Sequence, residues 1–299
     1  MKRTVVGILL ALTLTLGLAA QENPNRTALL AGLWMQNSAE YRALCLQAYR
    51  TATLDLDQRL ALNGGSPVVR EKVLVDGRPC WRERPMAVIM DLDETVIDNG
   101  GYQAFLYLSS QSFKPATWSA WLDYQAREAR ARRSVPGALD FIRHAEARGV
   151  KVFYISNRPS SGQESTASVL EQLGVSRPGP ERLLLEDKPA DAAAAERWGL
   201  GDALTRSQGA KERRRIQVQL ENAVVGYFGD DLADFVTYVK GSEPVADRYE
   251  LVEQNRARWG TEWYVLPNPS YGSWSPGQTL PADPSQFIDD FGFGASLEQ

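Results

Sequence analysis

Two aspartates, Asp91 and Asp93, follow directly after an apolar run at residues 86–90. The run is short and uninterrupted, which is typical of a strand buried on both faces. Side chains alternate along a strand, so both carboxylates point the same way just past its carboxyl end, where open α/β sheets place their ligands. Carboxylates this close repel each other and need a cation or a shared proton. An Asp-x-Asp pair alone fits a solvated loop equally well, but Thr95 and the polar stop at 98–99 favour a site.

A second apolar run, residues 223–228, ends in the segment Gly-Asp-Asp-Leu-Ala-Asp, which contains Asp230 and Asp234. Strands that alternate with helices along a chain predict a mostly parallel sheet. If the two acidic strand ends are neighbours in that sheet, their aspartates converge. Four aspartates and a lysine make an oxygen-rich site suited to magnesium. In that site Asp91 and Asp230 would offer carboxylate oxygens, and Asp93 its backbone carbonyl.

Such a constellation suits the transfer of a phosphoryl group to a carboxylate. A carboxylate attacking a phosphate dianion meets about 4 kcal/mol of repulsion per charge pair at ~4 Å and an effective dielectric of about 20. Magnesium and one lysine cancel that repulsion. Ser156, which ends a predicted strand at 150–155, can bind another phosphate oxygen together with nearby backbone amides. Asp93, two residues from a nucleophilic Asp91, can protonate the leaving alkoxide and then deprotonate the hydrolytic water.

Composition excludes several other classes of protein. The chain has 299 residues and a net charge of −4, which argues against a surface that binds nucleic-acid polymers. Its single histidine, His144, lies in a predicted helix that ends at Gly149, so Ser-His-Asp catalysis and multi-histidine zinc sites are hard to build. The two cysteines, Cys45 and Cys80, either form a disulfide worth about 3–4 kcal/mol or stay too far apart to pair.

The first 20 residues have the layout of a cleaved secretory signal. Lys2 and Arg3 precede an apolar run at 5–18, which closes in two small residues. The run is too short to span a bilayer comfortably, and no cysteine at the cut could take a lipid anchor. We therefore expect an exported protein, periplasmic or secreted, without a stable membrane anchor.

Helical and strand patterns place the acidic motifs in an α/β fold. We expect a single domain at 21–299, with a catalytic core at about 84–240 and helical flanks at 26–62 and 245–275. The insert after the first strand is predicted to roof the site. Within this frame the pattern predicts a helical break at 37–38, a helix that begins near Thr117, a basic solvated run at 127–133, helices at 137–149, 163–173 and 211–220, strands at 150–155, 182–185 and 223–228, and an aromatic loop at 263–274.

The motifs Asp-Leu-Asp-Glu-Thr-Val-Ile-Asp-Asn (91–99), Ile-Ser-Asn-Arg (155–158), a following lysine and Gly-Asp-Asp-Leu-Ala-Asp-Phe (229–235) resemble the four motifs of the haloacid dehalogenase (HAD) superfamily. More narrowly, they resemble the class C nonspecific acid phosphatases, the four-aspartate family that includes bacterial lipoprotein e. The flanks at 33–41 and 266–274 are similar to those of the family as well. The resemblance implies a HAD-like parallel sheet flanked by helices, with a smaller, mostly helical domain.

The resemblance also implies a role for each matching residue. Asp91 would be the phosphoryl acceptor, Asp93 the acid/base and Ser156 a phosphate binder; Asp230 would hold Mg²⁺ with support from Asp234. The catalytic lysine is predicted to be Lys211, because an arginine, Arg215, follows four residues later as in the family. Lys188, which precedes an insert at 189–208, remains the alternative. Trp118 and Tyr271 are the candidates for stacking on a nucleobase or aryl group, and Asn157 is a further candidate for substrate binding.

The resemblance implies a magnesium-dependent acid phosphatase that hydrolyses small phosphomonoesters such as nucleoside 5′-monophosphates and aryl phosphates. It also implies a homodimer, which is common in the family. One alternative is a phosphatase with a narrow pocket for sugar phosphates. The other is a non-catalytic storage or binding protein on the same fold. Presence of the nucleophile Asp91 favours the enzyme.

Overall fold

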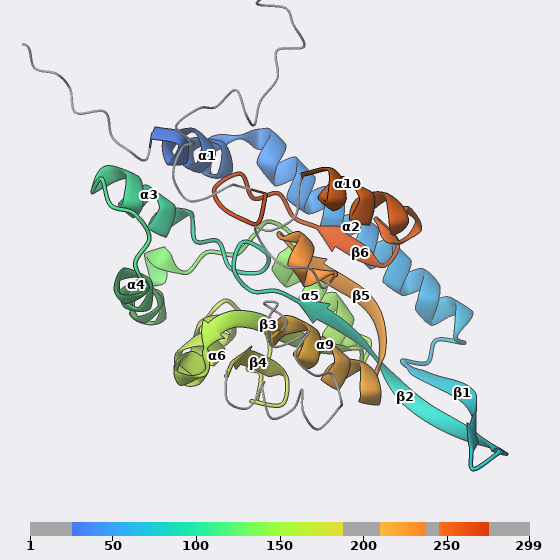
Figure 1. Cartoon of the computed structure of the whole chain (residues 1–299). Coiled ribbons are helices and arrows are strands. Elements are labelled where there is room, and N and C mark those ends of the chain that lie inside the picture. Colours follow the sequence, from blue (N-terminus) through green and yellow to red (C-terminus); the bar gives the residue numbers. More distant parts are fainter. Residues whose placement is uncertain (1–25, 188–209, 237–244, 275–299) are drawn as a thin grey trace, which may run out of the picture.

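The computed structural model describes residues 26–187, 210–236 and 245–274 (Figure 1). Three predicted features lie outside these ranges: the signal segment, Lys188 as the alternative catalytic lysine, and the insert that follows it. The helices are α1 (Arg26–Asn37), α2 (Ala39–Leu62), α3 (Gly100–Leu108), α4 (Pro115–Arg127), α5 (Ala138–Ala147), α6 (Gln163–Gln172), α9 (Ala210–Glu221) and α10 (Val245–Gln254). The strands are β1 (Val68–Val75), β2 (Arg78–Met90), β3 (Lys151–Pro159), β4 (Leu183–Glu186), β5 (Ala223–Gly229) and β6 (Trp263–Val265).

A parallel sheet forms the centre of the fold, as the sequence predicted. Its strand order is β4-β3-β2-β5-β6, and each neighbouring pair on this path is parallel. The apolar run that ends β2 is buried on both faces of the sheet. Met86, Val88 and Met90 belong to one hydrophobic core cluster and Ala87 and Ile89 to another, as alternation along a strand requires.

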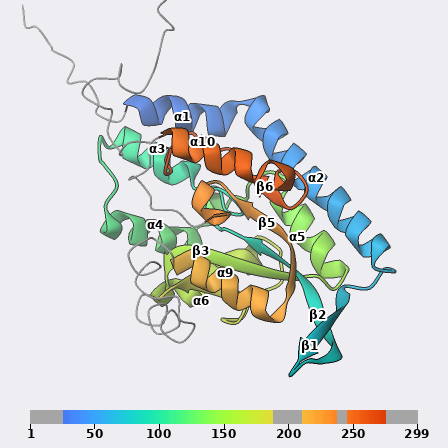
Figure 2. The same ribbon diagram turned by 45° about the vertical axis from the view of Figure 1, so that its right-hand side comes forward.

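Helices cover both faces of the sheet (Figures 1 and 2). On one face α2 and α5 bury aromatic rings against β5: Tyr49 stacks on Phe228 with ring centroids 5.5 Å apart, and Phe141 lies 4.6 Å from the same ring. On the other face α9 contributes Val218 to the second core cluster. Because both faces are covered there, the parts of the strands inside the parallel sheet must be apolar, which is why their runs could be recognised in the sequence.

The predicted helical break at 37–38 is confirmed. Ser38 caps α2 by accepting a hydrogen bond of 2.8 Å from the backbone amide of Tyr41. In the insert, α4 begins close to Thr117 as expected, whereas the run at 127–133 leaves the helix at Arg127 and forms only a short 3₁₀ turn, Ala129–Ala131. The insert helices α3 and α4 stand beyond the carboxyl ends of β2 and β3 (Figure 1).

Helix α3 and strands β1 and β6 were not predicted. Strand β6 lies in the expected aromatic loop and extends the sheet beside β5. Strand β2 begins at Arg78, well before its apolar run, and pairs there with β1 in an antiparallel arm that projects from the body (Figures 1 and 2). Arg82 and Arg84 of the arm donate to backbone carbonyls at the carboxyl end of α9, those of Leu220, Gln219 and Asn222. These contacts satisfy helix-end acceptors and place positive charge at the negative end of the helix dipole.

The two cysteines do not pair. Cys45 is buried on α2, and Cys80 is exposed on the arm. Across residues 26–187, 210–236 and 245–274, no helix has both the length and the apolar character needed to cross a membrane.

Candidate active site

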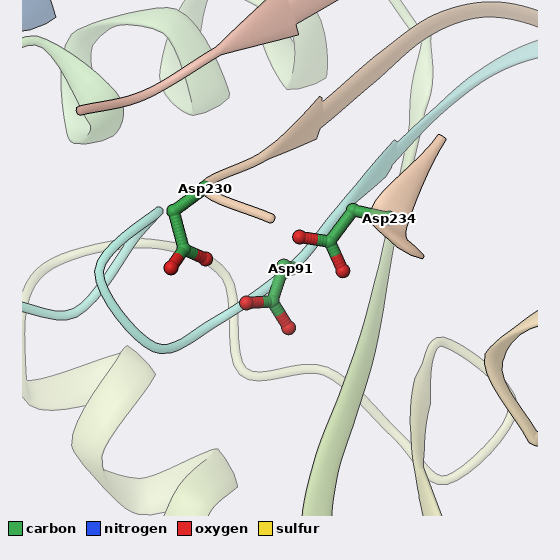
Figure 3. Close-up of side chains that lie close together, drawn as sticks. All are labelled: Asp91, Asp230 and Asp234. Atoms are coloured by element: carbon green, nitrogen blue, oxygen red, sulfur yellow. The ribbon is translucent and has the colours of Figure 1, made fainter. Parts of the chain in front are cut away.

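The ends of β2 and β5 bring the two acidic motifs together. In the parallel pairing Met90 lies opposite Phe228, and the amide of Asp91 donates to the carbonyl of Phe228 at 2.9 Å. Asp91 and Asp230 therefore leave adjacent strands at the same edge of the sheet. The short 3₁₀ turn Leu232–Asp234 then folds back and returns Asp234 to the same point (Figure 3).

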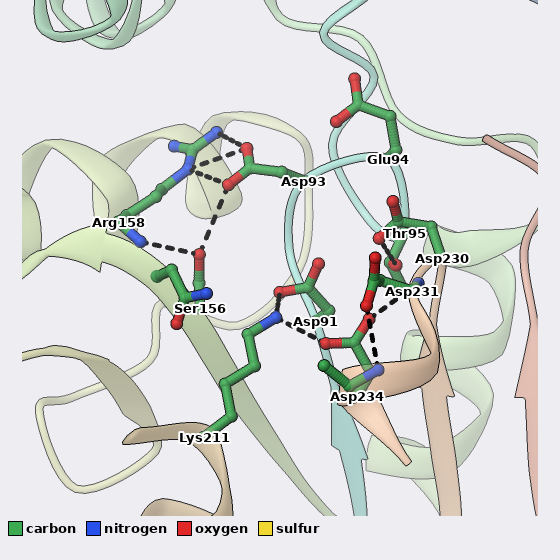
Figure 4. Close-up of polar contacts among 12 residues, drawn as sticks. Asp91, Asp93, Glu94, Thr95, Ser156, Arg158, Lys211, Asp230, Asp231 and Asp234 are labelled. Atoms are coloured by element: carbon green, nitrogen blue, oxygen red, sulfur yellow. Dashed lines mark hydrogen bonds and ion pairs between the residues drawn. The ribbon is translucent and has the colours of Figure 1, made fainter. Parts of the chain in front are cut away.

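Three carboxylates converge at this edge. Asp91, Asp230 and Asp234 each place one carboxylate oxygen so that the three atoms lie within 4.8 Å of one another. Lys211, at the start of α9, reaches in from the other side: its Nζ lies 2.7 Å from Asp91 and 2.6 Å from Asp234 (Figure 4). Lys211, the lysine preferred from the sequence, therefore lies beside Asp91, whereas the alternative Lys188 is outside the described residues.

The cluster combines three carboxylates with a single ammonium group, that of Lys211. Burial raises the pKa of Asp91 to about 7, although Lys211 opposes the shift. Burial, together with the carboxylates of Asp91 and Asp234, also raises the pKa of Asp230 well above its ordinary value. Burial alone would lower the pKa of Lys211, but Asp234 and Asp91 outweigh it and the pKa rises. A second positive charge would therefore be strongly favoured here.

Neighbouring groups hold the cluster in place. Asn268 donates to Asp230 at 2.8 Å, and the Thr95 hydroxyl lies 3.4 Å from the same carboxylate. Asp231 turns away from the cluster: its carboxylate caps the 3₁₀ turn and accepts from the amide of Ser273 at 2.6 Å. Of the two adjacent aspartates in this motif, only Asp230 therefore faces the site.

Asp93 lies beside the cluster, with its carboxylate directed towards Arg158 and Ser156 (Figure 4). Arg158 of β3 binds it through Nε and Nη2, the shortest contact being 2.7 Å, and the Ser156 hydroxyl lies 3.4 Å away. Ser156 and Arg158 are two residues apart on β3 and so share a side of the strand. Sequence reasoning assigned a role to Ser156 but none to Arg158, although this alternation was a signal that could have found it.

The predicted substrate-binding residues lie around this edge. Trp118 of α4 packs against Tyr102, with ring centroids 5.1 Å apart, and its ring lies 6.0 Å from the guanidinium carbon of Arg158. The Tyr271 hydroxyl donates to the carboxylate of Glu94, a buried residue that sequence reasoning did not single out. The side chain of Asn157 is exposed on β3 and accepts from Arg214 at 3.3 Å.

Glu94 itself has an unusual environment. Its backbone is left-handed, with φ of 56°, and its side chain is fully buried. Burial, followed by the nearby charge of Asp93, raises the pKa of Glu94 to about 8. A non-glycine residue in this conformation costs about 1–3 kcal/mol and persists only where surrounding contacts enforce it. The loop after β2 is thus held in a specific shape by its packing.

Comparison with known proteins shows the family of this chain. A family model described as HAD superfamily, subfamily IIIB (Acid phosphatase) matches residues 18–274. The chain belongs to this family. As an acid phosphatase it is a hydrolase of small phosphate monoesters, and the resemblance drawn from the four motifs is confirmed.

Two solved structures of similar acid phosphatases agree with this assignment. The structure of the class C acid phosphatase from Bacillus anthracis is 31% identical to this chain with a TM-score of 0.66, and the match covers 84% of this chain and 88% of that one. The crystal structure of the class C acid phosphatase from Bacillus anthracis with tungstate bound is 30% identical, with the same TM-score and coverage. The predicted HAD-like fold is thereby confirmed.

HAD phosphatases are generally metal-dependent, and the residues present here fit a hard divalent cation. The donor atoms are carboxylate oxygens, the ligand type such cations prefer. Burial and the neighbouring carboxylates raise the pKa of Asp91 and of Asp230, so that both charged forms are disfavoured without a further cation. A bound cation would supply that positive charge.

Proposed function

We propose that this acid phosphatase is a Mg²⁺-dependent enzyme that hydrolyses phosphomonoesters through a phosphoaspartate at Asp91. The observation that carries the proposal is the cluster of Asp91, Asp230, Asp234 and Lys211 at the ends of two adjacent parallel strands. A carboxylate can attack a phosphate only where the repulsion between them is cancelled. This cluster, with a cation, provides that cancellation.

Each residue of the chain then has a distinct task. Asp91 attacks phosphorus and the ester oxygen leaves, so that one P–O bond forms as another breaks. Lys211 stays ionised next to the nucleophile and stabilises the charge on the transferring group. Ser156, with its hydroxyl beside Asp93, binds a phosphate oxygen. Bound Mg²⁺, held by Asp91, Asp230 and the backbone carbonyl of Asp93 with support from Asp234, would neutralise phosphate charge.

Asp93 transfers the protons. In the first half-reaction it donates a proton to the leaving alkoxide, and in the second it accepts one from the water that attacks the phosphoaspartate. Its carboxylate is fixed next to the Ser156 hydroxyl by Arg158. The same carboxylate therefore serves both steps from a fixed place beside Ser156.

Chelation is the direct test of the metal requirement. Treatment with a chelator is expected to lower phosphate release by at least ~100-fold, and added Mg²⁺ to restore it, because transition-state charge would otherwise face the carboxylates unscreened. Added Mg²⁺ is also expected to raise the melting temperature of the chelated protein by relieving repulsion in the cluster. Activity can be followed with p-nitrophenyl phosphate and melting by differential scanning fluorimetry.

A matched pair of variants shows where the ion binds. Asp230→Asn should abolish the Mg²⁺-induced rise in melting temperature. Asp231→Asn should keep it, because the Asp231 carboxylate faces backbone amides and not the cluster. Full activity in excess chelator would contradict the proposed metal dependence.

For the substrate we propose nucleoside 5′-monophosphates and aryl phosphates, with Trp118 and Tyr271 as stacking groups and Asn157 as a further contact. Trp118 is half-buried near Arg158, which itself holds Asp93. A substrate whose base or aryl ring stacks on Trp118 would direct its phosphate towards the aspartate cluster.

Trp118→Ala is expected to raise KM for a nucleoside 5′-monophosphate by about 5- to 100-fold with little change in kcat, since a stacked base is worth roughly 1–3 kcal/mol. The KM for a small alkyl phosphate, which has no ring to stack, should stay within twofold of the parent. Trp81→Ala, on the exposed arm, serves as a control for loss of a tryptophan elsewhere. An unchanged nucleotide KM in Trp118→Ala would remove the stacking role.

We further propose that the protein is exported after cleavage near residue 20, to the periplasm or the medium, that residues 21–299 form a single domain, and that it works as a homodimer. The basic start and short apolar run of residues 1–20 support export. Amino-terminal sequencing of the mature protein tests the cleavage, and light scattering tests the homodimer.

A further inference from the structure

Asn99, immediately before α3, is fully buried and uses both ends of its side-chain amide. Its Nδ2 donates to Asp93 at 2.8 Å and to Glu94 at 3.3 Å. Its Oδ1 accepts from Nε1 of Trp121 and Nε2 of Gln125, each at 2.9 Å. No step of the proposed reaction uses Asn99, yet it touches the acid/base directly.

Trp121 decides which way the Asn99 amide points. An indole N–H can only donate, so the atom of Asn99 that faces it must be the carbonyl oxygen. The amide nitrogen is then forced to face the two carboxylates, which need donors. A tryptophan on α4 therefore determines the hydrogen bonding of Asp93 without touching it.

Gln125 closes this arrangement into a ring. Its Nε2 donates to Asn99, and its Oε1 accepts from Nη2 of Arg158 at 3.3 Å. Arg158 and Asn99 both donate to the same oxygen of Asp93, Oδ1. Oδ1 is thus held by two side chains, whereas Oδ2 accepts from Nε of Arg158 at 3.2 Å and lies 3.4 Å from the Ser156 hydroxyl.

We propose that Asn99 is a positioning residue that fixes the orientation of the Asp93 carboxylate, and that Trp121 acts through it. The inference rests on the proposed function, in which Asp93 transfers the protons. Asn99 restrains Oδ1, and Oδ2 stays on the side of the Ser156 hydroxyl. Helix α4, which carries both Trp118 and Trp121, is thereby linked to the acid/base.

The consequence is a dependence on the leaving group. A phenolate with electron-withdrawing groups departs without a proton, whereas an alkoxide needs one from the acid. Loss of the orientation of Asp93 should therefore harm alkyl phosphates far more than p-nitrophenyl phosphate. General loss of structure would lower kcat/KM for both substrates by the same factor.

The experiment measures kcat/KM for a series of phosphate monoesters from p-nitrophenyl to alkyl in the full-length protein with Mg²⁺. Asn99→Ala is expected to lose about 100-fold on an alkyl phosphate, as for misplacement of a catalytic group by ~1 Å. Its loss on p-nitrophenyl phosphate should be no more than about 5-fold, because that leaving group draws little on general acid catalysis.

Trp121→Phe keeps an aromatic ring but removes the N–H together with part of the indole, and it is a second, milder variant expected to show the same steepening at about 10-fold. Asn99→Asp keeps the shape but turns a carboxylate towards Asp93 and Glu94, and should be at least as impaired as Asn99→Ala on alkyl esters. Gln36→Ala is the matched control: Gln36 donates to the carbonyl of Gly100, next to Asn99, without touching the carboxylates. Its leaving-group dependence should equal that of the parent.

Asp93→Asn, measured in parallel, distinguishes the positioning role of Asn99 from the proton-transfer role of Asp93. If Asp93→Asn steepens the dependence and the Asn99 and Trp121 variants do not, the positioning role is overturned while the proposed function stands. If Asp93→Asn itself leaves the dependence unchanged, the proton-transfer role and the inference fail together. Steepening in Asp93→Asn, Asn99→Ala and Trp121→Phe, with none in Gln36→Ala, establishes the positioning role.

Discussion

Asp91→Asn is expected to release phosphate from p-nitrophenyl phosphate at least ~10⁴-fold more slowly than the parent enzyme, because removal of a covalent nucleophile leaves only binding and electrostatic contributions to the rate. An amide has the shape of the carboxylate but cannot form the phosphoryl ester. The matching observation is acid-quenched mass spectrometry: the parent should carry a phosphoryl adduct during turnover, and the variant none.

Folding of this variant is not expected to suffer. Burial and the neighbouring carboxylates already disfavour the charge on Asp91, whose raised pKa reports that cost. A neutral side chain relieves repulsion from Asp234 while giving up one contact with Lys211, which keeps its second partner at 2.6 Å. The melting temperature in chelator should therefore equal or exceed that of the parent. An adduct that persists in Asp91→Asn would rule out Asp91 as the acceptor.

Lys211→Met is expected to lower kcat by about 10³-fold, because it removes the ammonium group that stabilises charge on the transferring phosphoryl group. It also leaves two buried carboxylates without their shared cation, a change that costs about 3–5 kcal/mol where a buried pair is broken. Chemical denaturation measured with and without Mg²⁺ separates the effect on folding from the effect on catalysis.

Lys188→Met provides the control that the sequence itself offers. The two lysines compete for one role in the motif, so the variant at 188 should retain activity within about twofold if Lys211 stabilises the transferring phosphoryl group. The opposite pattern, with Lys188→Met inactive and Lys211→Met active, would transfer that role to the other lysine.

The convergence of Asp91 and Asp230 could be predicted because it depends on backbone topology alone. Apolar runs mark buried strands, and parallel strands end at a common edge of the sheet. The helical pattern of 26–62 was equally clear, since its apolar residues recur at helical spacing and Ser38 is a standard cap. These features follow from periodicity, which the sequence carries openly.

The polar contacts around Asp93 could not be predicted in the same way. Whether Asn99 meets Trp121 depends on the shape of the loop after β2, including the left-handed backbone at Glu94. That shape results from packing between segments distant in sequence, and no local propensity encodes it. The antiparallel arm escaped prediction for a different reason: its residues 78–83 are exposed and largely polar or charged, so they lack the apolar run of a buried strand.

The arm also helps to fix the position of α9. Arg82 and Arg84 of β2 donate to backbone carbonyls at the carboxyl end of the helix, and Asp91, the residue after β2, accepts from Lys211 at its amino end. The helix is therefore held to the same strand at both of its ends. The spacing of nucleophile and ammonium is therefore set by β2 and α9 and not by α4, so that a substitution in α4 can reach the acid/base through Asn99 while this spacing stays unchanged.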